Sequence, residues 1–219
     1  MALLLGLLLP LRAQFGISAV YTVPQVSFAD GSIENFLDDG LEFSANYWFR
    51  LKEKRVEFLP TISYVKYNYS DREVIGQEPL FPATFREIGF QFHTRIYPFD
   101  FGTDCDCPTF GKQAPALEKG FFIQLSPGIS WLEDVNSIRP PDQEDEQQAS
   151  SFLPTIGVAV GLDFGLSNLV TLSPIAGFRY SIGDAPNALE YNSAVATDDN
   201  YSKFFAGLHL GIRLDEKRY

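Results

Sequence analysis

The feature that most constrains the fold is a period-two alternation of apolar residues, which recurs along almost the whole chain after residue 14. In its clearest instance, the segment 203–214, every second residue is apolar: Phe204, Ala206, Leu208, Leu210, Ile212 and Leu214. Successive side chains of a β-strand point to opposite faces, so alternation of this length predicts a strand with one apolar face. A helix would instead repeat its apolar positions every 3.6 residues.

The same alternation occurs in seven further segments, at 15–22, 41–50, 56–63, 87–96, 121–130, 155–164 and 170–181. Strands of roughly 9–13 residues have the length needed to cross a bilayer at a tilt. Strands of soluble sandwiches are usually shorter, at about 5–6 residues. We therefore predict an all-β fold, an eight-stranded antiparallel up-and-down β-barrel that spans a membrane.

The connecting segments differ in length in a regular way. Tight turns are expected at 52–54 and 165–168, and long loops at 25–40, 70–84, 133–150 and 183–200. Short turns at one end and long loops at the other are typical of barrels with a periplasmic and an outer side. The link 98–119 departs from this pattern, because it is long at the end where the turns should be short.

One face of each predicted strand is almost purely apolar, whereas the other mixes charged residues with Gly, Ser and Thr. A Lys or Arg that faces lipid at mid-bilayer costs about 2–4 kcal/mol, whereas acids and bases inside a narrow barrel can pair. We therefore expect the apolar faces to contact lipid. The charged side chains expected to line the bore are Glu42, Arg50, Glu57, Glu87, His93, Arg95, Asp163, Arg179, Lys203, His209 and Arg213. A secreted, lipocalin-like ligand-binding barrel with an apolar interior is the alternative, since alternation alone does not say which face is inside.

Aromatic residues cluster near both ends of the predicted strands, as expected for the two girdles at the membrane interfaces. We assign Trp48 and Tyr97 to the girdle near the short turns, and Tyr67 to the girdle near the long loops. Strand 56–63 changes phase after Tyr64, which predicts a bulge at that point.

Four prolines lie in or near the predicted strands, at Pro60, Pro127, Pro154 and Pro174. Proline cannot donate a hydrogen bond to a sheet ladder, so it usually marks a strand end or a bulge. We expect one or the other at each of these positions.

The N-terminus predicts export from the cytoplasm. The run Leu3 to Leu11 has the length of a signal-peptide h-region, and Ala13 is a suitable last residue before cleavage. Residues 1–13 are therefore expected to be a signal peptide and residues 14–219 the barrel domain. The formal net charge of −11 argues against a nucleic-acid partner, whose phosphates require Lys and Arg.

Cys105 and Cys107 form a Cys-x-Cys in the link 98–119. We favour a local disulfide, because exported proteins meet an oxidising compartment; free thiols, or metal or redox chemistry, are the alternatives. A zinc site would need about four ligands, and the two histidines are predicted in the bore, away from this link. We expect no metal and no cofactor. No Gly-x-Ser-x-Gly or similar motif accompanies His93 and His209, so we also expect no enzymatic activity.

The sequence resembles the small outer-membrane β-barrel proteins, in particular the "outer membrane protein beta-barrel domain" family common in Bacteroidetes. The resemblance rests on the Ala13-Gln14 cleavage pattern, on Leu-Ser-Pro-Gly-Ile at 125–129 and on the segment 204–214. It implies the outer membrane of a Gram-negative bacterium as the location. It also implies insertion by the barrel-assembly machinery and contact with outer-membrane lipids and lipopolysaccharide. It does not imply one activity, because this fold hosts adhesins, narrow pores, lipid enzymes and anchors.

An eight-stranded barrel is barely wide enough to be filled by its own side chains. We therefore expect a salt-bridged plug and a structural, anchoring or interaction role for a monomer, with a narrow porin-like or apolar-solute channel as the alternative. The long loops hold 17 of the 28 acidic residues of the chain. These acids are expected to be solvated and to repel neighbours. The alternatives are divalent-cation bridges to anionic lipopolysaccharide, or recognition of a basic partner.

Overall fold

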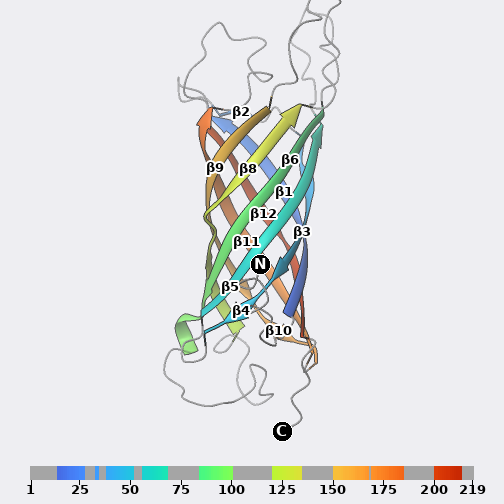
Figure 1. Ribbon diagram of the computed structural model, residues 1–219, viewed down its shortest axis with the longest axis vertical. Coiled ribbons are helices and arrows are strands. Elements are labelled where there is room, and N and C mark those ends of the chain that lie inside the picture. Colours follow the sequence, from blue (N-terminus) through green and yellow to red (C-terminus); the bar gives the residue numbers. More distant parts are fainter. Residues whose placement is uncertain are drawn as a thin grey trace, which may run out of the picture.

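The computed structural model is a closed antiparallel β-barrel whose strands are strongly tilted (Figure 1). The structure describes residues 14–27, 33–34, 38–51, 56–68, 84–100, 120–134, 150–167, 169–184 and 200–213. The strands are β1 (Gln14–Ser27), β2 (Ile33–Glu34), β3 (Gly40–Tyr47), β4 (Phe49–Arg50), β5 (Val56–Asn68), β6 (Thr84–Ile96), β7 (Phe121–Leu125), β8 (Gly128–Asp134), β9 (Ser150–Leu162), β10 (Phe164–Gly165), β11 (Val170–Asp184) and β12 (Asn200–Arg213). A short 3-10 helix, η1 (Pro98–Asp100), follows β6. No helix in these ranges is long and apolar enough to span a membrane.

The barrel wall has eight strands, because β3 with β4, β7 with β8, and β9 with β10 each form one interrupted crossing. Around the wall the order is β1, β3/β4, β5, β6, β7/β8, β9/β10, β11 and β12. The barrel closes where β12 pairs with β1, from Gln14 opposite Arg213 to Ser27 opposite Asn200. The predicted eight-stranded antiparallel barrel is confirmed. We call the end that carries Gln14, Leu51 and Leu166 the turn end, and the opposite end the loop end.

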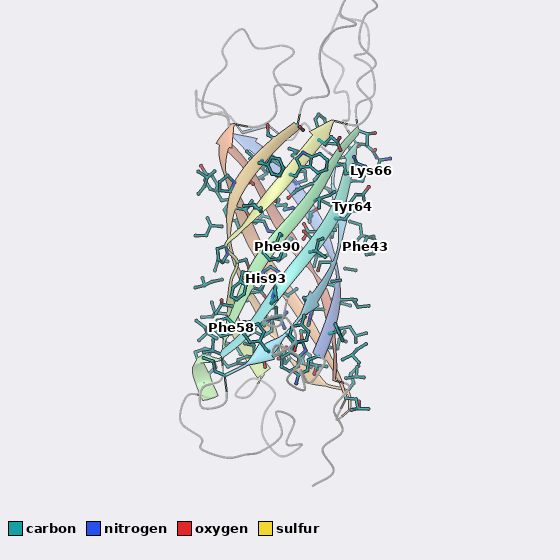
Figure 2. The ribbon with its side chains drawn as sticks, viewed as in Figure 1. Phe43, Phe58, Tyr64, Lys66, Phe90 and His93 are labelled. Atoms are coloured by element: carbon teal, nitrogen blue, oxygen red, sulfur yellow. The ribbon has the colours of Figure 1, made fainter. Side chains whose placement is uncertain are left out.

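The apolar faces of the strands point outward, as predicted. Ile62 is 58% exposed and Leu208 is 50% exposed, although both lie in the middle of long strands. Figure 2 shows Phe43 projecting from the outside of the wall. Large apolar side chains exposed in this way around a whole barrel form a surface suited to lipid rather than to water. The interior holds buried charged and polar side chains, such as Glu42, Glu87 and Lys203, together with apolar ones. The lipocalin-like alternative, which needs an apolar interior, therefore does not apply.

The prolines lie beside interruptions of the ladder, not at bulges. Pro60 pairs in unbroken register with Phe92 on β6, and its other side faces the break between β3 and β4. Pro174 pairs with Leu208 and lies beside the break between β9 and β10. Pro154 lies just beyond the last pair between β9 and β11, and Pro127 lies in the break between β7 and β8. A strand edge that needs no amide hydrogen at that point tolerates proline.

The bulge predicted after Tyr64 is wrong, because β5 and β6 pair without a shift from Val56 to Asn68. Val65 and Tyr67 continue the inward phase and are 1% and 0% exposed. A bulge does occur at the loop end of β11, where the pairing with β12 shifts between Ser181 and Asp184. Gly183 lies in this bulge with a φ of 117°, a conformation that side-chain-bearing residues rarely adopt.

Three aromatic residues assigned to the girdles face the interior instead. Trp48, Tyr67 and Tyr97 are 7%, 0% and 1% exposed, because each shares the inward phase of its strand. The girdle at the turn end is built from other rings, which contact one another in a row across β1, β3, β4, β5 and β6. The row consists of Phe15, Tyr47, Phe49, Phe58 and Phe92, with successive ring centroids 5.3–6.4 Å apart.

Candidate functional site in the barrel interior

The inward faces of the strands bring the predicted bore residues together inside the wall. Glu42, Glu57, Glu87, His93, Arg95, Arg179, Lys203 and His209 are between 1% and 9% exposed, and Asp163 is half-buried. The side chains of Arg50 and Arg213 lie outside the described part of the structure, as do residues 1–13, Cys105 and Cys107. The predictions of a signal peptide and of a local disulfide therefore stay predictions.

Four charged side chains form a continuous chain across the loop half of the interior. Arg179 Nη1 lies 3.0 Å from Glu42 Oε2, and Lys203 Nζ lies 2.8 Å from the same oxygen. Lys203 Nζ also lies 2.9 Å from Glu87 Oε2. We call Arg179, Glu42, Lys203 and Glu87 the ion chain. It alternates in sign and contains two acids and two bases, so its formal charge is zero.

Neutral donors complete the hydrogen bonding of the ion chain at Glu87. Ser130 Oγ donates to Glu87 Oε1 at 2.8 Å, and the Tyr201 hydroxyl donates to Glu87 Oε2 at 3.1 Å. The Arg179 guanidinium also lies 5.4 Å from the ring centroid of Phe205. Buried charges cost several kcal/mol each to desolvate, and they are tolerated when partners and further hydrogen bonds satisfy them. The ion chain, with members on β3, β6, β11 and β12 and a further partner on β8, meets this condition at Glu42, Lys203 and Glu87. Arg179 Nε is buried without a partner among the described residues.

A second polar cluster occupies the turn half of the interior. The Tyr97 hydroxyl lies 2.9 Å from Glu57 Oε2 and 2.7 Å from Asp163 Oδ2, and Ser173 Oγ donates to Asp163 Oδ1 at 2.5 Å. Arg95 donates from Nε to Gln124 Oε1 at 2.9 Å, and its guanidinium lies 4.4 Å from the ring centroid of Phe122.

The two histidines lie in the same half of the barrel but have different surroundings. His93 Nδ1 lies 2.7 Å from Ser126 Oγ, so this ring has a hydrogen-bond partner. Both ring nitrogens of His209 are buried without a partner among the described residues. The His209 ring fits there because Gly16 has no side chain, since a Cβ at Gly16 would lie 2.3 Å from His209 Nε2.

Several interior residues were not among the predicted site residues. Tyr67, Tyr97, Tyr201, Ser130 and Thr22 all belong to the polar interior. Their position in the alternation of each strand, which we call strand parity, would have identified them. Tyr97 is two residues after Arg95 and Tyr201 is two residues before Lys203, so each lies on the same face as that inward charge. For the tyrosines at strand ends, parity is a better guide than the general enrichment of tyrosine at membrane interfaces.

Large inward side chains are fully buried at several levels along the barrel axis. The largest fully buried side chains include Tyr67, Tyr97, Tyr201, Phe85, Phe122 and Lys203, and all of them point inward. Side chains that lined an open, water-filled bore would keep part of their surface exposed. Exposed fractions of 0–1% therefore indicate that these side chains pack against one another.

A closed barrel with an apolar outer surface and a polar interior is the architecture of bacterial outer-membrane proteins. The chain folds as a transmembrane β-barrel. No protein-family profile matches it, and no curated protein matches its sequence. The predicted resemblance to the "outer membrane protein beta-barrel domain" family common in Bacteroidetes is therefore not supported by a family match.

Solved structures with a similar fold are small outer-membrane barrels. The attachment invasion locus protein Ail of Yersinia pestis, in complex with the heparin analogue sucrose octasulfate, is 12% identical, with a TM-score of 0.45 over 92% of this chain and 99% of that one. Neisserial surface protein A is 14% identical, with a TM-score of 0.46 over 91% of this chain and 97% of that one. The N-terminal barrel domain of Pseudomonas aeruginosa OprF is 16% identical, with a TM-score of 0.38 over 91% of this chain and 96% of that one. Identities this low say nothing about a shared activity.

Proposed function

We propose that this protein is a structural outer-membrane barrel with a closed bore, which anchors and displays its loops at the cell surface. Its role is structural or interactive rather than catalytic. The observation that carries the proposal is the ion chain, which connects side chains from opposite parts of the wall and leaves little of their surface exposed. A barrel held shut in this way has the rigidity of an anchor and lacks the open lumen that a diffusion pore needs.

The loops that such an anchor would display are acidic. The four long connections predicted from the sequence hold 17 of the 28 acidic residues, against Arg72 and Arg139 as their only basic residues. Carboxylates at this density keep neighbouring molecules apart and attract cations. A basic surface of a partner, or divalent cations between these acids and lipopolysaccharide, would complement them. We further propose that the barrel acts as a monomer and is inserted by the barrel-assembly machinery.

Electrical conductance in planar lipid bilayers tests the closed bore. The refolded wild-type protein is expected to give no steady current at neutral pH. The double variant Lys203→Ala/Glu87→Ala is expected to give one, because it removes the centre of the ion chain without leaving either partner as an unpaired buried charge. Lys66→Ala is the matched control, since Lys66 is an exposed lysine on the outside of the wall. A steady current through the wild-type protein would overturn the proposal.

One observation favours a narrow channel as a second candidate. In the turn half of the barrel, His209 Nδ1 and Nε2, Asn46 Oδ1 and Gln91 Nε2 are buried without partners among the described residues. Buried polar groups without protein partners are the groups that interior water satisfies. If water enters this half, the barrier to ions is confined to the loop half, where the ion chain lies with the buried rings of Tyr67, Phe85 and Tyr201. Removal of Glu42 would then be expected to open a path through that barrier. The same bilayer measurement on Glu42→Ala distinguishes the two candidates.

A further inference from the structure

Two basic side chains on the outside of the wall stand apart from the other cations. Of the Lys and Arg side chains that the structure describes, Arg95, Arg179 and Lys203 face the interior, whereas Lys66 and Arg86 face outward. Lys66 on β5 and Arg86 on β6 are directly opposite each other in the antiparallel register. Both lie near the loop end, and Figure 2 shows Lys66 projecting from the wall there. We call Lys66 and Arg86 the rim pair.

Placing two like charges directly opposite each other on neighbouring strands is unfavourable. Outward orientation adds a further cost if both side chains meet only hydrocarbon. Neither cost arises if an anion lies between them. Lys66 has no hydrogen-bond or ion-pair partner among the described residues, so none of them occupies its three ammonium donors.

Arg86 is only partly satisfied by its neighbour on β8. Its Nε donates to Glu133 Oε2 at 3.0 Å, and its Nη2 contacts the same oxygen. A guanidinium has five N–H donors, so three of them remain for another acceptor. The ion pair with Glu133 fixes the orientation of the guanidinium while leaving part of it open, since the side chain is 37% exposed.

Aromatic side chains around the rim pair mark the level of the membrane interface. The Arg86 guanidinium lies 5.9 Å from the ring centroid of Trp131, which stacks on Phe152 at 6.3 Å. Tyr64, two residues before Lys66 on the same face, is 45% exposed. Tyr and Trp on the outer wall of a barrel lie at the depth of the lipid headgroups. The rim pair therefore lies at the depth at which headgroup phosphates occur.

We propose that Lys66 and Arg86 bind a phosphate of an anionic lipid headgroup in the outer leaflet, with the acyl chains of that lipid lying along the apolar faces of β5 and β6. The inference rests on the proposed orientation of the barrel, with its loop end in the outer leaflet. It does not depend on whether the bore conducts.

Native mass spectrometry of the refolded full-length protein in detergent micelles tests the proposal, with diphosphoryl lipid A as the probe. Wild type is expected to bind one lipid A molecule more tightly than its dephosphorylated form. Lys66→Gln/Arg86→Gln is expected to weaken binding of diphosphoryl lipid A about ten- to thirty-fold, as expected for two basic groups at a membrane surface. The charge-preserving control, Lys66→Arg/Arg86→Lys, is expected to stay within about threefold of wild type.

Glu133→Gln provides a test in the opposite direction. It releases Arg86 and removes the competing carboxylate, so it is expected to strengthen binding of diphosphoryl lipid A. Equal binding by wild type and the double Gln variant, or equal binding of the dephosphorylated lipid, would overturn the proposal. Displacement of the lipid by inorganic phosphate at a similar concentration would show a site for free phosphate, and would also overturn it. None of these outcomes depends on the conductance measurement, so the two proposals fail independently.

Discussion

Lys203 and Glu87 meet at the centre of the barrel from opposite strands. β12 and β6 are separated by three strands in either direction around the closed wall. Lys203 Nζ nevertheless lies 2.9 Å from both Glu87 Oε1 and Glu87 Oε2. A contact of this kind ties the two halves of the wall together through the interior, and Glu42 and Arg179 extend it to β3 and β11.

Removing the lysine of this contact should destabilise the barrel. Lys203→Met keeps most of the side-chain volume but leaves Glu87 as a buried acid without its cation, which costs about 3–5 kcal/mol. The free energy of unfolding from lipid vesicles in urea measures the effect. Lys203→Met/Glu87→Gln should recover part of the loss, because it removes the uncompensated charge. A double variant less stable than the single variant would contradict the attribution of this loss to an uncompensated Glu87 charge.

Two glycines of β12 should respond differently to the same substitution. A Cβ at Gly207 would lie 2.3 Å from the backbone oxygen of Ala19, whereas the nearest atom to a Cβ at Gly211 would be 3.6 Å away. Gly207→Ala is therefore expected to lower the unfolding free energy by about 1–3 kcal/mol, because the backbone of β1 would have to move. Gly211→Ala is the control and should be close to neutral. Urea unfolding of the two variants side by side checks the prediction, and equal stability would contradict it.

A charged side chain on the outward face of β12 should destabilise the barrel. Leu208→Arg places a guanidinium in the middle of a strand at a position that is 50% exposed to lipid, and about 2–4 kcal/mol should be lost. Leu166→Arg is the control, because Leu166 lies in the turn after β10, where an arginine can reach water and the expected cost is about 0–1 kcal/mol. Vesicle refolding yields and urea unfolding measure both. Equal tolerance of the two arginines would contradict the lipid-facing assignment of Leu208.

The hydroxyl of Tyr97 should contribute to stability at the turn end. Tyr97→Phe removes the hydroxyl that hydrogen-bonds to Glu57 and Asp163, and it leaves the ring packed against Phe122, with ring centroids 5.7 Å apart. Loss of a hydrogen bond to a buried charged group costs about 1.5–3 kcal/mol. Urea unfolding of this variant checks the prediction. Phe122→Leu, which alters the packing but keeps the hydroxyl, separates the two contributions, and an unchanged stability of Tyr97→Phe would assign the role of Tyr97 to packing alone.

Strand parity made most of the interior predictable. Inward charges such as Glu42, Arg95 and Lys203 were identified because they share a phase with Gly, Ser and Thr on their strands. The errors came from a different argument, the enrichment of aromatic residues at membrane interfaces. Tyr67 and Tyr97 lie near strand ends, but their phase places them inside, where their hydroxyls bond to Thr22 and to Glu57 and Asp163. Local backbone geometry fixes which way a side chain points, whereas composition describes only an average over many barrels.

The sequence by itself determined the strands and the face on which each residue lies, because successive side chains alternate between the two sides of a strand wherever that strand is placed. Only the tertiary structure decided which inward residues meet. Glu42 and Arg179 are 137 residues apart, and closure and tilt of the wall bring them to the same level. The height of each side chain along the barrel axis depends on the stagger between strands. That stagger depends in turn on the register of every strand pair around the barrel, and the sequence of one strand does not contain this information.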